Sequence, residues 1–190
     1  MTTSASAAPI DAEAQSRPRA NRIGLWLFFA SETFLFAALL SARFVTSGTS
    51  RPEEANQALA VGITAILLLS SISAYLAESA IASNKREQFL RYTRATIVLG
   101  LVFLVGVIFE FKEAHEFFPA GTIYGSAFFT LVGTHAFHVL TGIIALAVVL
   151  NLGHKGHFSA GSHWGVEGTI KYWHFIDLVW VVIYPTLYLF

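Results

Sequence analysis

The sequence has 190 residues, of which 55% are hydrophobic and 13% are charged, and its formal net charge is zero. Soluble domains carry about 25% charged residues, so this composition indicates an integral membrane protein, and the neutral balance gives no sign of a nucleic-acid partner. The chain has no cysteine, which excludes disulfides, thiolate metal sites and cysteine nucleophiles within it.

The chain begins with a polar segment. Residues 1–21 are rich in Ala, Ser and Thr and contain Pro9 and Pro18, which predicts a flexible cytoplasmic tail. Residues 22–190 are predicted to form one transmembrane domain. It holds five apolar stretches, each long enough to cross a bilayer as a helix, the third only just: Ile23–Val45, Ala58–Ala82, Ala95–Phe111, Ile123–Leu150 and Lys171–Phe190. Because helices satisfy their own backbone hydrogen bonds in lipid, the predicted fold is an all-α bundle of five transmembrane helices.

Basic residues are distributed unevenly between the two ends of these stretches. Nine lie on the side of the amino terminus: Arg17, Arg19, Arg22, Lys85, Arg86, Arg91, Arg94, Lys155 and Lys171. Three lie on the opposite side: Arg43, Arg51 and Lys112. Cytoplasmic loops carry the excess of Lys and Arg, so the amino terminus is predicted to lie inside and the carboxyl terminus outside.

The second stretch carries small residues at helical spacing. Ser70, Ala74 and Ala77 share one face, and Ser73 adjoins them. Small side chains let helix backbones approach each other in lipid, so this face is predicted to form a helix contact.

The fifth stretch, KYWHFIDLVWVVIYPTLYLF, places His174 and Asp177 one helical turn apart in an otherwise apolar segment. A charge at the centre of a bilayer costs about 2.5–3.5 kcal/mol on insertion scales, so such groups normally face protein. We therefore expect this helix to pack against a protein surface, because lipid alone would not satisfy it.

Seven ionisable side chains in all lie in apolar surroundings. They are Glu32, Glu78, Glu110, His135, His138, His174 and Asp177. Haem ligation is one interpretation, with His138 and His174 facing each other across helices, but bulky neighbours crowd both and four ligands on two helices are missing. A proton or ion path is a second, but the three glutamates lie at different depths and no stretch is broken at mid-membrane by Gly or Pro.

A static network of hydrogen bonds is the third interpretation and the one that physical chemistry favours. Interhelical hydrogen bonds contribute about 0.6 kcal/mol each on average, but leaving these groups unpaired would cost more. The seven residues are therefore predicted to form an intramembrane polar network, and no residue of the chain is predicted to be catalytic or to bind a cofactor or metal.

Four motifs mark a resemblance to a known family that runs from Gly24 to Phe190, nearly everything beyond the tail. They are GLWLFFASETFLFAALLSARF at Gly24–Phe44, FEFKEA at Phe109–Ala114, YGSAFFTLVGTHAFHVLTG at Tyr124–Gly142 and YWHFIDLVW at Tyr172–Trp180. With these motifs the chain resembles subunit III of the haem–copper terminal oxidases, cytochrome c oxidase above all. The last two motifs, in this order and at this spacing, are the most specific.

The resemblance implies a non-catalytic subunit without haem or copper, since those centres belong to subunits I and II. It implies a helical bundle docked against subunit I of an aerobic respiratory cytochrome c oxidase, where it stabilises the redox and proton-pumping core and supports proton uptake or oxygen access. The chain would then be part of an enzyme, the proton-translocating cytochrome-c oxidase, and cytochrome c or a quinol would contact the complex elsewhere. The family's buried glutamate corresponds to Glu32, and its recurrent polar positions correspond to His135, His138, Glu167, His174 and Asp177.

The chain also departs from the family's long, seven-helix form, because the two helices that come first in that form are missing. The lipid cleft that they enclose is therefore not implied, although bound phospholipid remains an expectation. Near Leu152 no arginine matches the one that meets a lipid phosphate in long forms. The predicted contacts with lipid headgroups are His154, Lys155, Glu167 and Lys171. The short form implies a multi-pass protein of a bacterial or archaeal plasma membrane.

Two alternatives stay open. Within the superfamily, an accessory subunit of a quinol oxidase or a nitric oxide reductase would show the same features, since the electron donor binds elsewhere. From a different class, a small haem-binding membrane cytochrome or a transporter would use the buried polar residues as ligands or as a path.

Overall fold

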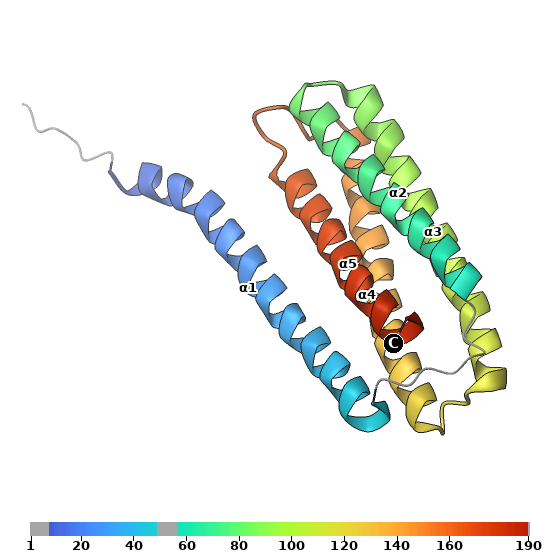
Figure 1. Cartoon of the computed structure of the whole chain (residues 1–190). Coiled ribbons are helices and arrows are strands. Elements are labelled where there is room, and N and C mark those ends of the chain that lie inside the picture. The colour runs from blue at the N-terminus through green and yellow to red at the C-terminus, as the bar shows by residue number, and fades with distance from the viewer. Residues whose placement is uncertain (1–7, 49–56, 190) are drawn as a thin grey trace, which may run out of the picture. The chain divides into compact units, whose positions relative to one another are not determined.

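A computed structural model describes residues 8–48 and 57–189 of the chain (Figure 1). Five α-helices follow one another: α1 (Ala8–Ser47), α2 (Gln57–Ala82), α3 (Arg86–Phe117), α4 (Ile123–His154) and α5 (Trp164–Tyr188). The predicted all-α fold with five helices is confirmed.

Several helices extend beyond the apolar stretches that predicted them. The third stretch begins at Ala95, whereas α3 begins at Arg86; the fifth begins at Lys171, whereas α5 begins at Trp164. At the start of α3, Arg86, Glu87, Arg91 and Arg94 lower the hydropathy, but Arg and Glu are good helix formers. The helix therefore continues past the part of it that is apolar.

At its start α1 overlaps the segment that was predicted as a tail. The helix begins at Ala8, while residues 1–7 lie outside the described part of the chain. The domain boundary after residue 21 stays a prediction.

Four helices are long and apolar enough to cross a membrane. These spans are Arg19–Ser47 within α1 and the whole of α2, α3 and α4. The fifth helix is not among them, because its first half carries Lys171, His174 and Asp177 together with several aromatic residues. A membrane protein with four such spans is thus confirmed among the described residues, and a crossing by α5 stays a prediction.

The chain divides into two compact units, one ending at Leu35 and the other comprising residues 36–190. In the second unit α2 packs on α3, α3 on α4, α4 on α5, and α5 on α2, which closes a four-helix bundle. Figure 1 shows these four helices side by side. Short connections make consecutive helices antiparallel neighbours.

Trp173 of α5 lies at the centre of this bundle and has no exposed surface. Its indole Nε1 donates a hydrogen bond of 3.0 Å to Ser70 Oγ on α2. Its ring fits against two glycines: a Cβ atom at Gly100 of α3 would lie 2.7 Å from the ring, and one at Gly142 of α4 would lie 2.9 Å from it. A single side chain thus joins all four helices, and the two glycines make the close approach possible.

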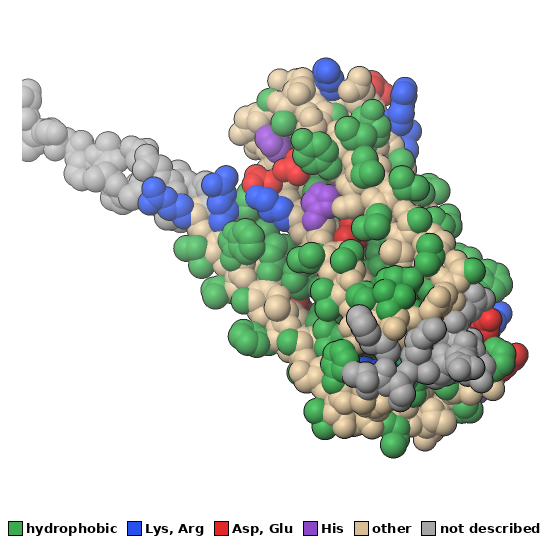
Figure 2. Space-filling model, in the orientation of Figure 1, with side chains coloured by type: hydrophobic (Ala, Val, Ile, Leu, Met, Phe, Trp, Pro, Cys, Tyr) green, Lys and Arg blue, Asp and Glu red, His purple; other side chains and the backbone are tan. Residues whose placement is uncertain are grey.

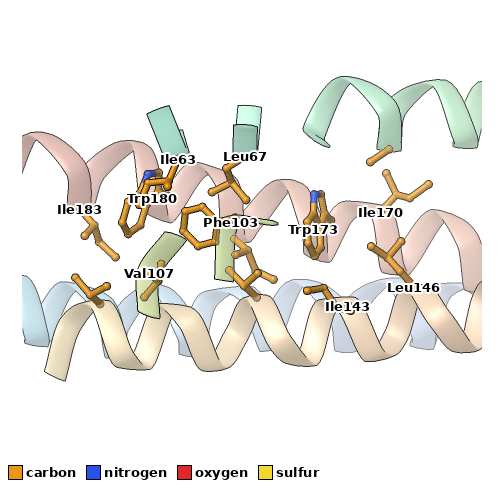
Figure 3. Packing of buried hydrophobic residues seen from close by; sticks show 14 of the residues in the cluster. Ile63, Leu67, Phe103, Val107, Ile143, Leu146, Ile170, Trp173, Trp180 and Ile183 are labelled. Atoms are coloured by element: carbon orange, nitrogen blue, oxygen red, sulfur yellow. The ribbon is translucent and has the colours of Figure 1, made fainter. Parts of the chain in front are cut away.

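Two turns further along α5, Trp180 forms a second layer of the same kind. Its Nε1 donates to Thr64 Oγ1 on α2 at 2.9 Å. Its ring meets Phe103 of α3 edge-on at 5.1 Å between centroids, and it meets His135 of α4 at 4.9 Å. Figure 3 shows both tryptophans projecting from α5 into the core, with Phe103 beside Trp180. Each buried indole N–H has a partner, which is what a buried tryptophan requires.

The helices α2 and α4 end in the same backbone motif. At the end of α2, Asn84 has a φ of 56°, and at the end of α4, Gly156 has a φ of 75°. In both places the N–H of the next residue donates to the carbonyl five positions back, which is the Schellman arrangement. Arg86, the first residue of α3, donates from Nε to Gly153 O at 3.0 Å and from Nη2 to His154 O. Its guanidinium therefore caps the last carbonyls of α4 and ties the two connections together.

Candidate functional site

Polar side chains follow the border between α2 and α5. We name this set the α2–α5 seam and define it as Ser71, Glu78, Glu167, Lys171, His174 and Asp177. The four members on α5 are spaced by four, three and three positions, so they share one face of the helix. Figure 2 shows acidic and histidine side chains gathered over the first half of α5, among hydrophobic side chains.

Asp177 is the most deeply buried member of the seam. It is 4% exposed, and neither of its carboxylate oxygens has a hydrogen-bond partner among the described residues. Ser71 lies close to the carboxyl without a hydrogen bond to it, and its hydroxyl oxygen lies 2.6 Å from Nδ1 of the half-buried His174. A serine hydroxyl has one proton to donate and rotates to suit its surroundings, so Ser71 can serve only one of these neighbours at a time. A buried carboxyl without a partner is costly, which makes Asp177 a candidate for a role beyond folding.

The other end of the seam, towards the α4–α5 connection, is charged. Glu167 and Lys171 form an ion pair across one helical turn of α5. The Lys171 ammonium also lies 5.6 Å from the centroid of the Trp164 ring. On α2, the half-buried Glu78 is close enough to interact electrostatically with Glu167, Lys171 and His163. The seam therefore runs from charged groups near the connection to a buried carboxyl inside the bundle.

His135 and His138 of α4 have other surroundings. His135 is fully buried, and neither ring nitrogen has a hydrogen-bond partner among the residues described. Its ring packs against Trp180 and Phe103. His138 lies 2.7 Å through Nδ1 from Thr134 O, one turn back on α4, and its ring meets Phe36 at 5.2 Å. The two histidines thus serve as packed rings in the core.

Glu110 of α3 takes part in a cluster at the carboxyl end of α5. Tyr188 Oη donates to Glu110 Oε1 at 2.5 Å, while Oε2 has no partner in the described part of the chain. Gln57 Nε2 donates to Tyr188 O at 3.0 Å, and Tyr124 Oη donates to Leu187 O at 2.8 Å. Side chains of α2, α3 and α4 therefore all bind the end of α5.

The structure joins several predicted polar residues to partners that the sequence analysis did not select. His174 is joined to Ser71, and Glu110 is joined to Tyr188. Glu32 lies on α1, in the unit that ends at Leu35. A network joining all seven predicted residues stays a prediction.

The four predicted lipid contacts lie near one end of the bundle helices. Glu167 and Lys171 pair with each other in the seam. His154 Nε2 accepts a hydrogen bond of 2.9 Å from Arg94, and Lys155 is exposed at the end of α4. Their contact with lipid headgroups stays a prediction.

Arg43 was counted in the sequence only as an outer basic residue, yet it is fully buried. Its Nη1 donates to Gly48 O at 2.6 Å, and its guanidinium lies 4.9 Å from the centroid of the Tyr124 ring. Counting charges cannot find such a residue. By contrast Ser71, which was also missed, directly follows Ser70 of the predicted helix contact, and that position is a usable signal.

Within residues 8–48 and 57–189, no three His, Asp or Glu side chains are arranged to hold a metal ion. That haem and copper belong to partner subunits remains a prediction.

Comparison with known proteins decides the family. A family model described as Cytochrome c oxidase subunit III matches residues 12–190. This chain belongs to the cytochrome c oxidase subunit III family. Proteins named cytochrome c oxidase subunit 3 from Coturnix japonica and Gallus gallus are each 35% identical to it, over 88% of this chain and 68% of the relative. The protein of the same name from Pongo pygmaeus is 34% identical over the same shares. The resemblance to subunit III is confirmed.

These relatives come from birds and a mammal. The comparisons therefore do not support the predicted bacterial or archaeal source, although they agree with a location in a membrane.

Proposed function

We propose that this member of the subunit III family is a non-catalytic subunit of an aerobic respiratory cytochrome c oxidase. Oxygen reduction and proton translocation take place in subunits I and II, which hold haem and copper. This chain stabilises that core and supports proton uptake or oxygen access. The observation that carries the proposal is the family match over residues 12–190, with relatives named cytochrome c oxidase subunit 3.

The surface of the bundle supports a place among lipid and partner helices. Large apolar side chains remain exposed on every helix of the bundle: Leu69 and Ile72 on α2, Val105 and Ile108 on α3, Ile144 and Val148 on α4, and Val181 and Val182 on α5. A soluble protein rarely exposes contiguous apolar surface on this scale. Lipid tails and the helices of subunit I are surfaces that would cover it.

In this proposal α5 is a fifth transmembrane helix. It has 25 residues, one fewer than α2, and it packs between α2 and α4, which both meet the requirements for a span. A helix in that position shares the depth of its neighbours. The amino terminus then lies inside and the carboxyl terminus outside, as the distribution of basic residues predicts.

The absence of cysteine allows a direct test of this topology, because single cysteines introduce the only thiols. We expect Lys85→Cys and Lys155→Cys to react with a membrane-impermeant maleimide only in inside-out vesicles. Gly121→Cys, in the α3–α4 connection, should react only in right-side-out vesicles. Leu189→Cys, directly after α5, should also react only in right-side-out vesicles, and labelling of Lys155→Cys and Leu189→Cys from the same side would contradict a crossing by α5.

Purification of the tagged chain from its native membrane tests the function itself. We expect it to bring down a complex that contains haem and copper, while the chain expressed alone shows no Soret band. Recovery of the chain without partner subunits, or haem bound to the chain alone, would overturn the proposal.

A further inference from the structure

The α2–α5 seam forms a line of ionisable groups that leads into the bundle and stops there. From Glu167 to Asp177 the line advances ten residues along α5, which is about 15 Å at the rise of an α-helix. Glu78 and Ser71 of α2 lie beside it. Charged groups stand at the end near the α4–α5 connection, and the apolar core surrounds the other end.

The His174–Ser71 step of this line is within hydrogen-bond distance, and the Ser71–Asp177 step is a close approach without a hydrogen bond. His174 Nδ1 lies 2.6 Å from Ser71 Oγ, and Ser71 lies next to the carboxyl of Asp177. Asp177 itself is 4% exposed and has no partner for either oxygen among the described residues. The fold thus leaves a buried acceptor open at the end of the line and places a rotatable hydroxyl between it and an imidazole.

We propose that Asp177 is a proton-binding site that exchanges its proton with water on the side of the α4–α5 connection, through Ser71 and His174. A protonated His174 gives the proton on Nδ1 to Ser71 Oγ, and the Ser71 hydroxyl proton passes to a carboxylate oxygen of Asp177. His174 becomes neutral and Asp177 becomes a neutral acid, so charge and protons balance. Asp, Glu and His chains are the usual elements of intramembrane proton relays. This relay has a blind end and stores one proton, in contrast to a path across the membrane.

Other titratable groups lie on the two helices that pack against α5. On α2 they are Tyr75 and Glu78, and on α4 they are Tyr124, His135, His138 and His154. Glu78 stands at the charged end of the seam, whereas His135 packs against Trp180 and His154 accepts from Arg94. No described side chain is hydrogen-bonded to the Asp177 oxygens, and Ser71 has the hydroxyl that lies close to them, so the proposal assigns the last transfer to Ser71.

The small number of aspartates allows the proposal to be tested on the isolated full chain. The test does not depend on the assignment of the chain to an oxidase. The sequence contains two aspartates, Asp11 and Asp177. The full chain can be made by cell-free synthesis with ¹³C-labelled aspartate and placed in lipid nanodiscs. Its isotope-shifted carboxyl infrared bands then come from these two aspartates alone. Asp177→Asn identifies the band of Asp177. The rate at which the protonated carboxyl exchanges in D₂O then reports its connection to water.

We expect a protonated Asp177 band at neutral pH that exchanges rapidly. Ser71→Ala and His174→Gln should both slow this exchange on the order of tenfold, because each breaks the relay. Glutamine keeps a hydrogen-bonding group near Ser71 but cannot carry an extra proton, so it separates a relay from a structural role. His138→Gln on α4 is the matched control and should exchange like the wild type. Absence of a protonated Asp177 band, or wild-type exchange in His174→Gln, would overturn the proposal.

Discussion

Two neighbouring faces of α5 differ in whether their buried polar atoms have hydrogen-bond partners. On the inner face, Trp173 and Trp180 each donate to a hydroxyl of α2 and pack against α3 and α4. On the face along the α2–α5 seam, Asp177 is equally buried, yet its oxygens have no partner in the described residues. Burial alone therefore does not distinguish the two tryptophans from Asp177, whereas the hydrogen bonding of their polar atoms does.

The difference also bears on energetics. A buried group that makes its hydrogen bonds loses them on substitution, whereas a buried group without a partner has none to lose. Substitutions on the inner face should lower the free energy of unfolding, and substitution of Asp177 should leave it nearly unchanged. The following variants, all measured in the full chain by SDS titration in mixed micelles with pulse proteolysis, test this contrast.

The largest effect is expected for Trp173→Ala. It opens a cavity where four helices meet and removes the hydrogen bond to Ser70, so the free energy of unfolding should fall by about 3–5 kcal/mol. Trp164→Ala, at the start of α5, is the control and should cost far less, because Trp164 is only half-buried. Equal losses for the two variants would break the contrast.

Gly100→Ala sharpens the same contrast from the opposite helix. The new Cβ would lie 2.7 Å from the Trp173 ring, which forces the ring or α3 to move and should cost about 1–3 kcal/mol. At Gly133 of α4 the nearest atom to a new Cβ is Phe111 Cζ at 3.9 Å, so Gly133→Ala should be neutral or stabilising by up to about 1 kcal/mol. A similar cost at both positions would point to backbone effects and away from packing on Trp173.

Tyr188→Phe probes a buried carboxyl that does have a partner. Removing the hydroxyl leaves Glu110 buried without its hydrogen bond, so the expected loss is about 1–3 kcal/mol. Tyr184→Phe, which alters the ring stacked on Tyr188, is the matched control and should change little. Stability equal to the wild type in Tyr188→Phe would show that Glu110 resembles Asp177.

Thr64→Val removes one hydrogen bond of the inner face and keeps the shape of the side chain. The indole of Trp180 loses its acceptor and stays buried, so the expected loss is about 1 kcal/mol, at the lower end of the cost of leaving a buried donor unpaired. The hydroxyl of Thr186 donates to Val182 O within α5, so Thr186→Val removes no interhelical hydrogen bond and should lower the free energy of unfolding less than Thr64→Val does. A loss in Thr186→Val that exceeds the loss in Thr64→Val would contradict this ranking.

The smallest effect is expected for Asp177→Asn. With no hydrogen bond to lose, the free energy of unfolding should stay within about 0.5 kcal/mol of the wild type. A loss as large as that of Tyr188→Phe would instead place Asp177 among the residues that hold the bundle.

Much of the fold follows from local properties of the sequence. Hydropathy locates the helices, since the first four apolar stretches fall within α1 to α4, and α4 begins at Ile123 as predicted. The fifth stretch overlaps α5 as far as Tyr188, and its last residue, Phe190, lies outside the described residues. The small residues of α2 also indicated a contact correctly, because Ser70 accepts from Trp173. Helix starts were less predictable, because α3 and α5 begin outside the apolar stretches, at Arg86 and Trp164. At the start of α3, charged residues with good helix propensity extend the helix after hydropathy has fallen.

Partners of the buried polar groups could not be predicted in the same way. Glu110 and Tyr188 are 78 positions apart, and Ser71 and His174 are 103 positions apart. Their pairing depends on how each helix is rotated about its axis within the bundle, which no local pattern specifies. Residue type indicated which groups need partners, and only the tertiary structure supplied them.

The tight turn between α2 and α3 has a consequence for biosynthesis. The connection consists of Ser83, Asn84 in the left-handed conformation and Lys85, which leaves α2 and α3 almost no freedom to separate. Helices joined this closely leave a translocon as a hairpin, because neither can move sideways into lipid without its neighbour. We expect α2 and α3 to be inserted together. α4 joins them once Gly153 and His154 have emerged, because their carbonyls can then accept hydrogen bonds from the Arg86 guanidinium.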